Sequence, residues 1–196
     1  MKIKYFIFSY RSFTPIPIVF ILLYFTEFRI PFLWIGLGLV FIGEYIRFKS
    51  VRYAGGITRT RNVGAPSLCQ SGPYSYVRNP LYVGNMFIYI GFVFIAGSDY
   101  IWELFYVVFI YFSIQYAMII ALEEKTLSNL FGKAYDQYKN NVPRFIPRST
   151  PWNNSDNRIA ASINITFINE KRTLQNIILF MFLIIIKNIL NDVILF

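Results

Sequence analysis

The sequence predicts an all-α fold: a polytopic membrane helix bundle of four spans, with a fifth span left open. Hydrophobic residues make up 56% of the 196-residue chain, against roughly 45–50% in soluble domains. They gather in runs about as long as a membrane is thick. The 19 Lys and Arg residues outnumber the 10 Asp and Glu residues and cluster between those runs. This placement is typical of cytoplasmic loops, so we expect membrane lipids and no nucleic acid as partners.

The scarcity of two residue types limits the chemistry. The sequence contains one cysteine, Cys69, and no histidine. An internal disulfide and a cysteine-based zinc site are thereby excluded, as are histidine-based catalysis and histidine metal ligation. We therefore expect no metal centre.

The first two predicted spans are residues 14–28, which prolines interrupt, and residues 31–48. The second span contains Glu44 and Arg47, and ionisable residues within a span are costly and often functional. Glu44 is therefore a candidate substrate-site residue. In the alternative interpretation, Glu44 pairs with Arg47 one helical turn away while Arg47 snorkels to the membrane interface. Three glycines of this span are expected to pack against another helix: Gly36, Gly38 and Gly43.

Residues 81–98 and 101–122 form the third and fourth predicted spans. The link between them is only Asp99 and Tyr100, which forces an antiparallel hairpin. The hairpin places the two flanking basic stretches, 49–80 and 123–148, on one side of the membrane, which the positive-inside rule makes the cytoplasm. The cations of the first stretch are Lys49, Arg52, Arg59, Arg61 and Arg78. The N-terminus, two spans earlier, is expected on the same side of a bacterial inner membrane or the endoplasmic reticulum.

The predicted membrane domain covers residues 1–148, with its core at 31–148. Residues 149–173 are polar and rich in asparagine, which predicts a flexible linker. Residues 174–196 form a C-terminal apolar helix with ten uninterrupted apolar residues before Lys187. Runs of that length are more often interfacial than spanning, so both placements stay open for this helix.

The stretch SGPYSYVRNPLYVGN, residues 71–85, is unusual at the start of a membrane span. Its Gly-Pro pair favours a turn, and the proline of its Asn-Pro pair suits the first turn of the next helix. Tyr74, Tyr76, Arg78, Asn79 and Tyr82 are thereby held at that helix N-terminus, where unpaired backbone donors favour an anion. A snorkelling arginine within an interfacial aromatic belt explains the same residues without a ligand.

A second unusual stretch, LEEKTLSNLFGKAYDQYKNNVPRFIP at residues 122–147, follows the fourth span. Glu123 and Glu124 lie where that span leaves the membrane, and paired carboxylates there can bind a sugar diol or face a cation. A solvated helix start explains the pair without a ligand. Leu127, Phe131 and Tyr138 recur at roughly helical spacing, which predicts an amphipathic interfacial helix.

Together, the two stretches and the hairpin between them resemble the integral-membrane isoprenylcysteine carboxyl methyltransferases and the related phospholipid methyltransferases. The resemblance covers about residues 31–148. It implies a cytoplasmic-side pocket for S-adenosylmethionine (SAM) and methyl transfer to a lipid or lipidated acceptor that enters from the bilayer. The implied cofactor-binding residues are Tyr76, Arg78, Asn79, Tyr82, Gly84, Glu123, Glu124, Tyr135 and Tyr138. Arg78 and Glu124 are the implied catalytic residues.

These residue types suit the cofactor chemically. A tyrosine face stabilises a sulfonium by a cation–π contact, an arginine binds a carboxylate, and glutamates accept hydrogen bonds from a diol or an amino group. One departure is Asn79, where the family usually has histidine. Asparagine donates and accepts hydrogen bonds but cannot act as a base. The tail beyond Arg148 is a second departure, because family members commonly end soon after the Val-Pro segment.

Two alternatives stay open from the sequence. Membrane reductases of the sterol-reductase type use NADPH and resemble this chain in an Arg-x-Pro-x-Tyr-x-Gly segment and in a C-terminal Tyr-x-x-Tyr segment before Val-Pro. Those chains are longer and carry further Arg and Cys residues where this one has Glu123 and Glu124. The other alternative is a non-catalytic membrane protein with a decayed cofactor site, which Asn79 and the unusual tail would suit.

Overall fold

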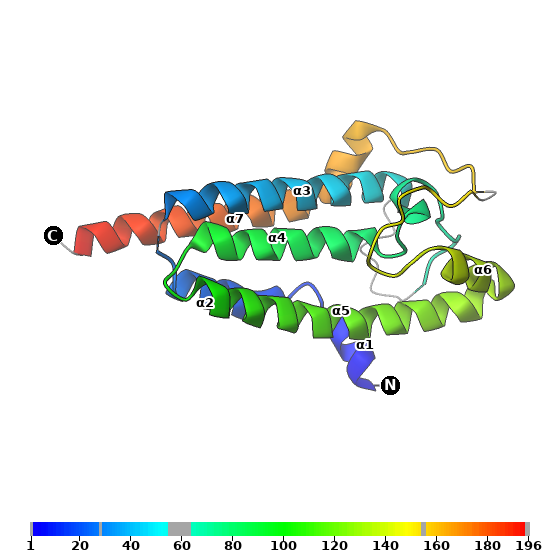
Figure 1. Cartoon of the computed structure of the whole chain (residues 1–196), viewed down its shortest axis with the longest axis horizontal. Coiled ribbons are helices and arrows are strands. Elements are labelled where there is room, and N and C mark those ends of the chain that lie inside the picture. Colours follow the sequence, from blue (N-terminus) through cyan, green and yellow to red (C-terminus); the bar gives the residue numbers. More distant parts are fainter. Residues whose placement is uncertain (1, 28, 55–63, 154–155, 195–196) are drawn as a thin grey trace.

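The computed structural model describes residues 2–27, 29–54, 64–153 and 156–194. Within these ranges the chain forms helices and connecting segments and no β-strand. The long helices lie side by side in one elongated bundle (Figure 1). The predicted all-α membrane helix bundle is confirmed. Arg59 and Arg61 of the predicted basic stretch lie outside the described residues.

The N-terminal part contains two short helices, α1 (Lys2–Ser9) and α2 (Pro15–Tyr24). The long helices are α3 (Ile30–Ala54), α4 (Pro80–Ala96), α5 (Ile101–Phe131) and α7 (Ile163–Ile194). The 3-10 helix η2 (Gly72–Ser75) and helix α6 (Lys133–Asn141) lie at the end of the bundle where α3 and α5 finish and α4 and α7 begin (Figure 1). We call this end the loop end and the opposite end the far end.

Helices α3 and α4 form an antiparallel pair whose backbones approach closely at glycines. A Cβ atom on Gly43 would lie 2.6 Å from the carbonyl oxygen of Gly84, and one on Gly36 would lie 2.6 Å from that of Gly91. The glycines are spaced two helical turns apart on each helix, so both contacts lie on one face. The predicted packing role of Gly36 and Gly43 is confirmed. Gly38 differs, because a Cβ there would meet nothing within 4 Å.

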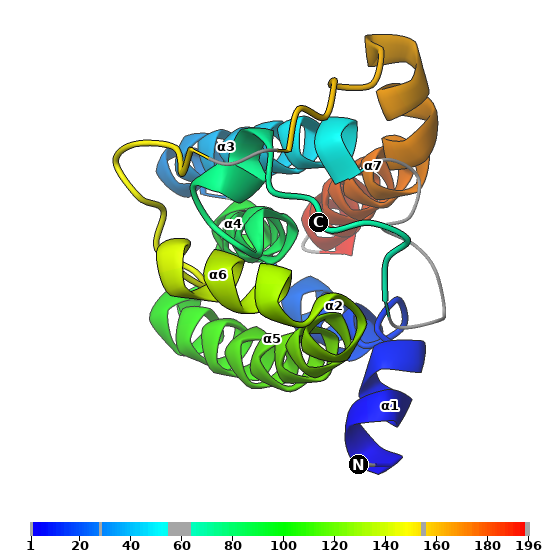
Figure 2. The ribbon, with the colours of Figure 1, turned by 90° about the vertical axis from the view of Figure 1, so that its right-hand side faces the viewer.

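Helix α4 lies at the centre of the bundle, between α3, α5 and α7 (Figure 2). Aromatic rings hold it there. Tyr89 stacks on Phe112 of α5 with 3.8 Å between ring centroids, and Phe92 packs on Phe180 of α7 at 4.2 Å. Val93 is fully buried in this core. Helix α4, which begins within the stretch 71–85, is therefore enclosed by the other long helices (Figure 2).

The predicted count of four spans is not confirmed. Within the described residues, three helices are long and apolar enough to cross a membrane: α3, α5 and residues 163–191 of α7. The predicted first span is reduced to α2, whose ten residues extend only about 15 Å. Its start is fixed by prolines at the first helical turn, and its backbone turns after Tyr24. The apolar α4 has 17 residues, or about 25 Å.

The C-terminal segment also differs from the expected flexible linker. Helix α7 begins at Ile163, well before the predicted start at residue 174. The chain before it is fixed to the loop end: the Arg158 guanidinium donates to the carbonyl of Tyr53 at 3.2 Å and to the hydroxyl of Ser67 at 2.8 Å. The Ala161 amide donates to the carbonyl of Arg52 at 2.7 Å. Part of the predicted linker, around Arg158 and Ala161, is thus held to the loop end by hydrogen bonds.

Candidate functional site

The two unusual sequence stretches meet at the loop end. The Arg78 amide donates to the carbonyl of Pro143 at 2.9 Å, and the Arg148 amide donates to the carbonyl of Tyr76 at 3.0 Å. The Trp152 amide donates to the carbonyl of Ser75 at 2.9 Å. Segments 75–78 and 143–152 are therefore joined through their backbones, which fixes the side chains that both stretches supply.

Local turn chemistry places the first stretch. Gly72 has φ = 59°, a left-handed conformation that favours glycine, and a Cβ there would lie 2.4 Å from the ring of Tyr53. The η2 turn follows, and Pro80 then begins α4. Asn79 is the N-cap residue of α4, but its side chain makes no capping bond. Its amide instead donates to the carbonyl of Arg144 at 3.2 Å, so Asn79 helps to place an arginine.

Arg78, Glu124 and Arg144 form the charged centre of the site. The Glu124 carboxylate accepts hydrogen bonds from Arg78 Nη2 at 3.0 Å and from Arg144 Nε at 3.1 Å, and it also bonds Arg144 Nη2. Arg78 Nη1 additionally donates to the carbonyls of Lys139 and Val142 at the end of α6. Glu124 and Arg78 are buried, whereas 41% of the Arg144 side chain is exposed. The bond to Glu124 raises the pKa of the Arg144 guanidinium above its usual value.

A second polar contact lies one residue earlier on α5. The phenol of Tyr82 donates to the Glu123 carboxylate at 2.9 Å, and the Tyr82 ring packs on Tyr116 with 4.9 Å between centroids. Glu123 is half-buried. Arg11, in the turn between α1 and α2, interacts electrostatically with the Glu123 carboxylate. The N-terminal segment thus contributes a cation to a site that the two stretches form.

Tyr135 and Tyr138 lie in a small separate core beneath the site. Both side chains are buried, and they pack with Val142, Leu127 and Trp152. The Tyr138 phenol donates to the carbonyl of Tyr74 at 2.8 Å. Burial raises the pKa of both phenols above the usual value, so they stay protonated. In contrast, the Tyr76 side chain remains 36% exposed.

Two further predicted residues lie in helix contacts. Gly84 faces α3, where a Cβ would lie 2.6 Å from Arg47 Cγ. Arg47 does not snorkel to the interface: it is 9% exposed and its Nη2 donates to both carboxylate oxygens of Glu170 on α7, at 2.9 and 2.8 Å. Arg47 also bonds Asn85 Oδ1 at 2.5 Å. The predicted pairing with Glu44 exists at 3.8 Å, so Glu44 belongs to this buried charge cluster.

The two best-formed cavities among the described residues are shallow, and neither is lined by the predicted cofactor residues. One cavity, of about 280 Å³, is lined by residues of the first stretch and of the tail: Ser71, Gly72, Ser75, Pro151, Trp152, Asn153 and Asp156. The other, of about 250 Å³, lies between α1 and α5. Both are smaller than the roughly 300–1,000 Å³ usual for small-molecule pockets. The predicted residues thus form a packed, charge-paired cluster.

Sequence reasoning missed Arg144 and Arg11 as members of this cluster. Arg144 follows the Val-Pro pair directly, and that position was the one available cue. Nothing in the sequence pattern indicated Arg11, because it approaches α5 only through the fold of α1 and α2.

Comparisons with known proteins agree with the region that forms the site. The family model for phospholipid methyltransferases matches residues 31–134. The chain is 32% identical over 115 residues to the protein-S-isoprenylcysteine O-methyltransferase of Schizosaccharomyces pombe, which covers 57% of this chain and 48% of that protein. The chain thus spans about half the length of this curated relative. No solved structure matches the chain.

Proposed function

The chain belongs to the phospholipid methyltransferase family, and we propose that it transfers a methyl group from SAM to a lipid or lipidated acceptor at the membrane. One observation carries the proposal. The fold brings the two sequence stretches together so that Arg78 meets Glu124 at 3.0 Å and Tyr82 meets Glu123 at 2.9 Å. The family and the relative are both methyltransferases, so neither the NADPH-reductase nor the non-catalytic alternative gains support.

The donor set suits SAM, which carries a sulfonium, a carboxylate, an ammonium group and a ribose diol. Glu123 is half-buried and can accept hydrogen bonds from the diol or the ammonium group. Arg144 is the exposed cation for the carboxylate, beside Arg78, whose buried Nε has no hydrogen-bond partner among the described residues. The exposed face of Tyr76 suits the sulfonium. When bound, SAM supplies an activated methyl group.

The remaining predicted residues position these groups. Glu124 fixes both arginines, and Asn79 holds the backbone of Arg144. Tyr135 and Tyr138 form the core that supports α6. Methyl transfer is an in-line displacement, so the protein mainly contributes alignment and exclusion of water. The ion pairs of Glu124 with Arg78 and Arg144, which join α5 to the segments before α4 and after α6, provide that alignment.

We further propose that the accepting atom is an oxygen of a lipidated molecule rather than a protonated amine. An ammonium nitrogen must lose a proton before it can accept a methyl group, whereas a carboxylate needs no base. The chain has no histidine to act as that base, and Asn79 cannot replace one. The fungal relative is named as an O-methyltransferase, which agrees with this choice.

The loop end is the proposed cytoplasmic end. Cations gather there on α3, on α6 and in the adjoining segments: Lys49, Arg52, Lys133, Lys139 and Arg148. At the far end, Arg29 pairs with Glu27 at 3.1 Å and with Asp99, so its charge is offset. This asymmetry follows the positive-inside rule. The cofactor site and the acceptor would then meet at the cytoplasmic membrane surface.

The test is a transfer assay with methyl-labelled SAM and membranes that contain the protein. One arm adds a prenylated cysteine with a free carboxylate, and the other adds phosphatidylethanolamine. We expect label in the prenylated cysteine, loss of labelling with Glu123→Gln, and no change with Lys133→Gln, an exposed α6 control. Label in phosphatidylethanolamine alone would overturn the choice of acceptor, and no label in either arm would contradict methyl transfer to these lipid classes.

A further inference from the structure

The cavity between α1 and α5 lies on the side of α5 opposite the proposed methyl-transfer site. Its α5 residues include Leu122, Lys125, Thr126 and Asn129, which recur at helical spacing and share one face. Glu123 and Glu124 point away from that face, toward Tyr82 and Arg78. The cavity is therefore a separate feature of the fold. We call it the α1–α5 groove.

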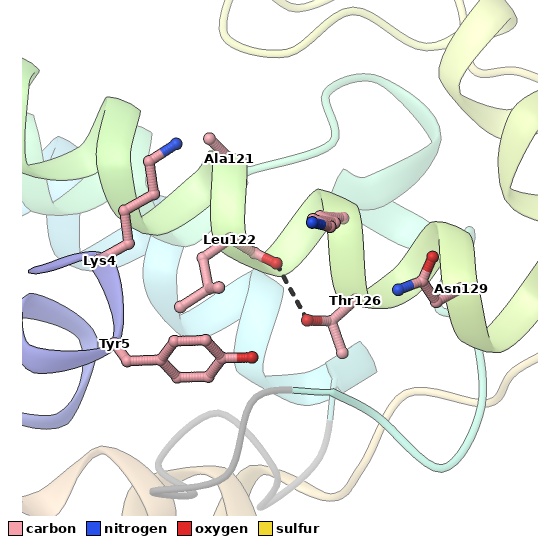
Figure 3. Close-up of a pocket in the computed structure, with 7 residues that line it drawn as sticks. Lys4, Tyr5, Ala121, Leu122, Thr126 and Asn129 are labelled. Carbon is pink, nitrogen blue, oxygen red and sulfur yellow. Dashed lines mark hydrogen bonds between the residues drawn. The ribbon is translucent and has the colours of Figure 1, made fainter. Parts of the chain in front are cut away.

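The polar groups of the groove favour an anion. Lys4 of α1 and Lys125 of α5 both line it, and none of its described lining residues carries a carboxylate. Tyr5 and Asn129 add a hydroxyl and an amide as further donors to the same lining, and the labelled Thr126 lies beside them in Figure 3. Thr126 donates its hydroxyl proton to the carbonyl of Leu122 at 3.0 Å. Two ammonium groups that line one cavity, with no acidic side chain among its lining residues, make that cavity attractive to an anion.

An apolar track leads from the groove along α5 toward the far end. Ile110, Ile114, Ala117 and Ala121 lie three or four residues apart on the face that continues to Lys125. Ile110 and Ile114 are 54% and 56% exposed, so this face contacts lipid tails in a membrane. An acyl chain lying on this track would place its headgroup at the two lysines.

Helix α1 has the composition of an interfacial helix. Tyr5 is 47% exposed and Phe6 is 63% exposed, and aromatic side chains of this kind gather at the level of lipid headgroups. Phe8 on the same helix is buried against the bundle core. Helix α1 thus packs on the bundle through Phe8, while Lys4, Tyr5 and Phe6 remain available to the membrane surface.

We propose that the α1–α5 groove binds the phosphate of an anionic phospholipid, with an acyl chain along the Ile110–Ala121 track. The bound phosphate accepts hydrogen bonds from Lys4 and Lys125, offsets one of their two positive charges and thereby links α1 to α5. Because Arg11 follows α1 and interacts with Glu123, the lipid also supports the N-terminal edge of the proposed methyl-transfer site. The lipid in this groove is a structural ligand and is distinct from the methyl acceptor.

Native mass spectrometry of the detergent-purified chain tests the proposal with phosphatidylglycerol and phosphatidylcholine as probes. We expect selective retention of phosphatidylglycerol. Each of Lys4→Gln and Lys125→Gln should weaken that retention about fivefold, the usual contribution of one cation near an anionic membrane surface. Lys133→Gln removes an exposed lysine outside the groove and should leave retention unchanged.

A competition arm with millimolar inorganic phosphate separates a lipid headgroup from a free anion. Retention of phosphatidylglycerol in the presence of phosphate supports the lipid site. Phosphate binding without any preference for phosphatidylglycerol over phosphatidylcholine would overturn it, as would equal weakening by Lys133→Gln. This readout does not depend on methyl transfer, so the proposed lipid site and the proposed function can fail separately.

Discussion

Replacement of Glu170 by glutamine tests the buried charge cluster that joins α7 to α3. Glu170 is fully buried, and both of its carboxylate oxygens accept hydrogen bonds from Arg47 Nη2, at 2.9 and 2.8 Å. Glutamine keeps the shape of the side chain but removes the charge. Arg47 then remains buried with Glu44, at 3.8 Å, as its charged partner. The perturbation thus isolates the electrostatic part of the contact.

The expected cost follows from the loss of one charge from a buried pair. Breaking such a pair costs about 3–5 kcal/mol, because the remaining ion stays desolvated. We expect the low end, about 3 kcal/mol, since Glu44 retains part of the attraction. For a chain of this length, that cost corresponds to a fall in Tm of roughly 6–12 °C. The Thr173 hydroxyl and Asn85 keep Arg47 hydrogen-bonded in the variant.

Thermal unfolding in a fixed detergent, followed by loss of the monodisperse protein peak, measures the change. Glu103→Gln on the exposed face of α5 is the matched control and should shift stability by less than about 0.5 kcal/mol. The triple variant Glu44→Met, Arg47→Met and Glu170→Met removes all three charges of the cluster and should recover much of the loss. A Glu170→Gln protein as stable as the wild type would refute the reasoning, and α7 would then dock by apolar packing alone.

Three further outcomes are expected. Gly91→Ala should lower the Tm, because the new Cβ would lie 2.8 Å from the carbonyl oxygen of Gly36. Gly38→Ala is the control and should leave the Tm unchanged, because a Cβ there meets nothing within 4 Å. Equal Tm values for the two variants would contradict the close α3–α4 contact. Burial raises the pKa of the Cys69 thiol to about 11. Alkylation of Cys69 at pH 8 should therefore be slow in the folded protein and fast after unfolding. Rapid alkylation of the folded protein would contradict this raised pKa. Arg158→Met should speed limited proteolysis near Ser67, because it releases contacts between the tail and the loop end; an unchanged cleavage rate would show that these contacts do not hold the segment.

The helix pattern of the central region could be predicted because local signals agree with the packing there. Apolar runs, the proline at the start of α4 and the short link at Asp99 and Tyr100 placed the starts of α3, α4 and α5 within one residue of those observed. The ends of α3 and α5 extend beyond the predicted spans, to Ala54 and Phe131. The same signals placed the two unusual stretches at one end of the bundle. Where residue type, turn chemistry and hydrophobic pattern agree, the sequence is informative.

The remainder depended on contacts between distant parts of the chain. Arg47 and Glu170 are 123 residues apart, and neither indicates its partner by spacing. A polar tail therefore resembled a linker, although Glu170 and Thr166 are fully buried. The first span is not confirmed for a different reason: its apolar run reaches spanning length only if the prolines and the residues after Tyr24 are counted. In the charge cluster, Arg11 approaches Glu123 through tertiary structure that no local pattern encodes.

The central claim is that the loop end binds SAM through Glu123. Calorimetric titration of SAM into the folded, detergent-purified chain tests it most directly, with NADPH as comparator. Glu123→Gln preserves the acceptor for the Tyr82 phenol but removes the charge, and Lys133→Gln is the control. We expect micromolar SAM binding that Glu123→Gln abolishes and Lys133→Gln retains, and we expect no binding of NADPH. Absence of SAM binding in folded protein, or binding of NADPH instead, would contradict it.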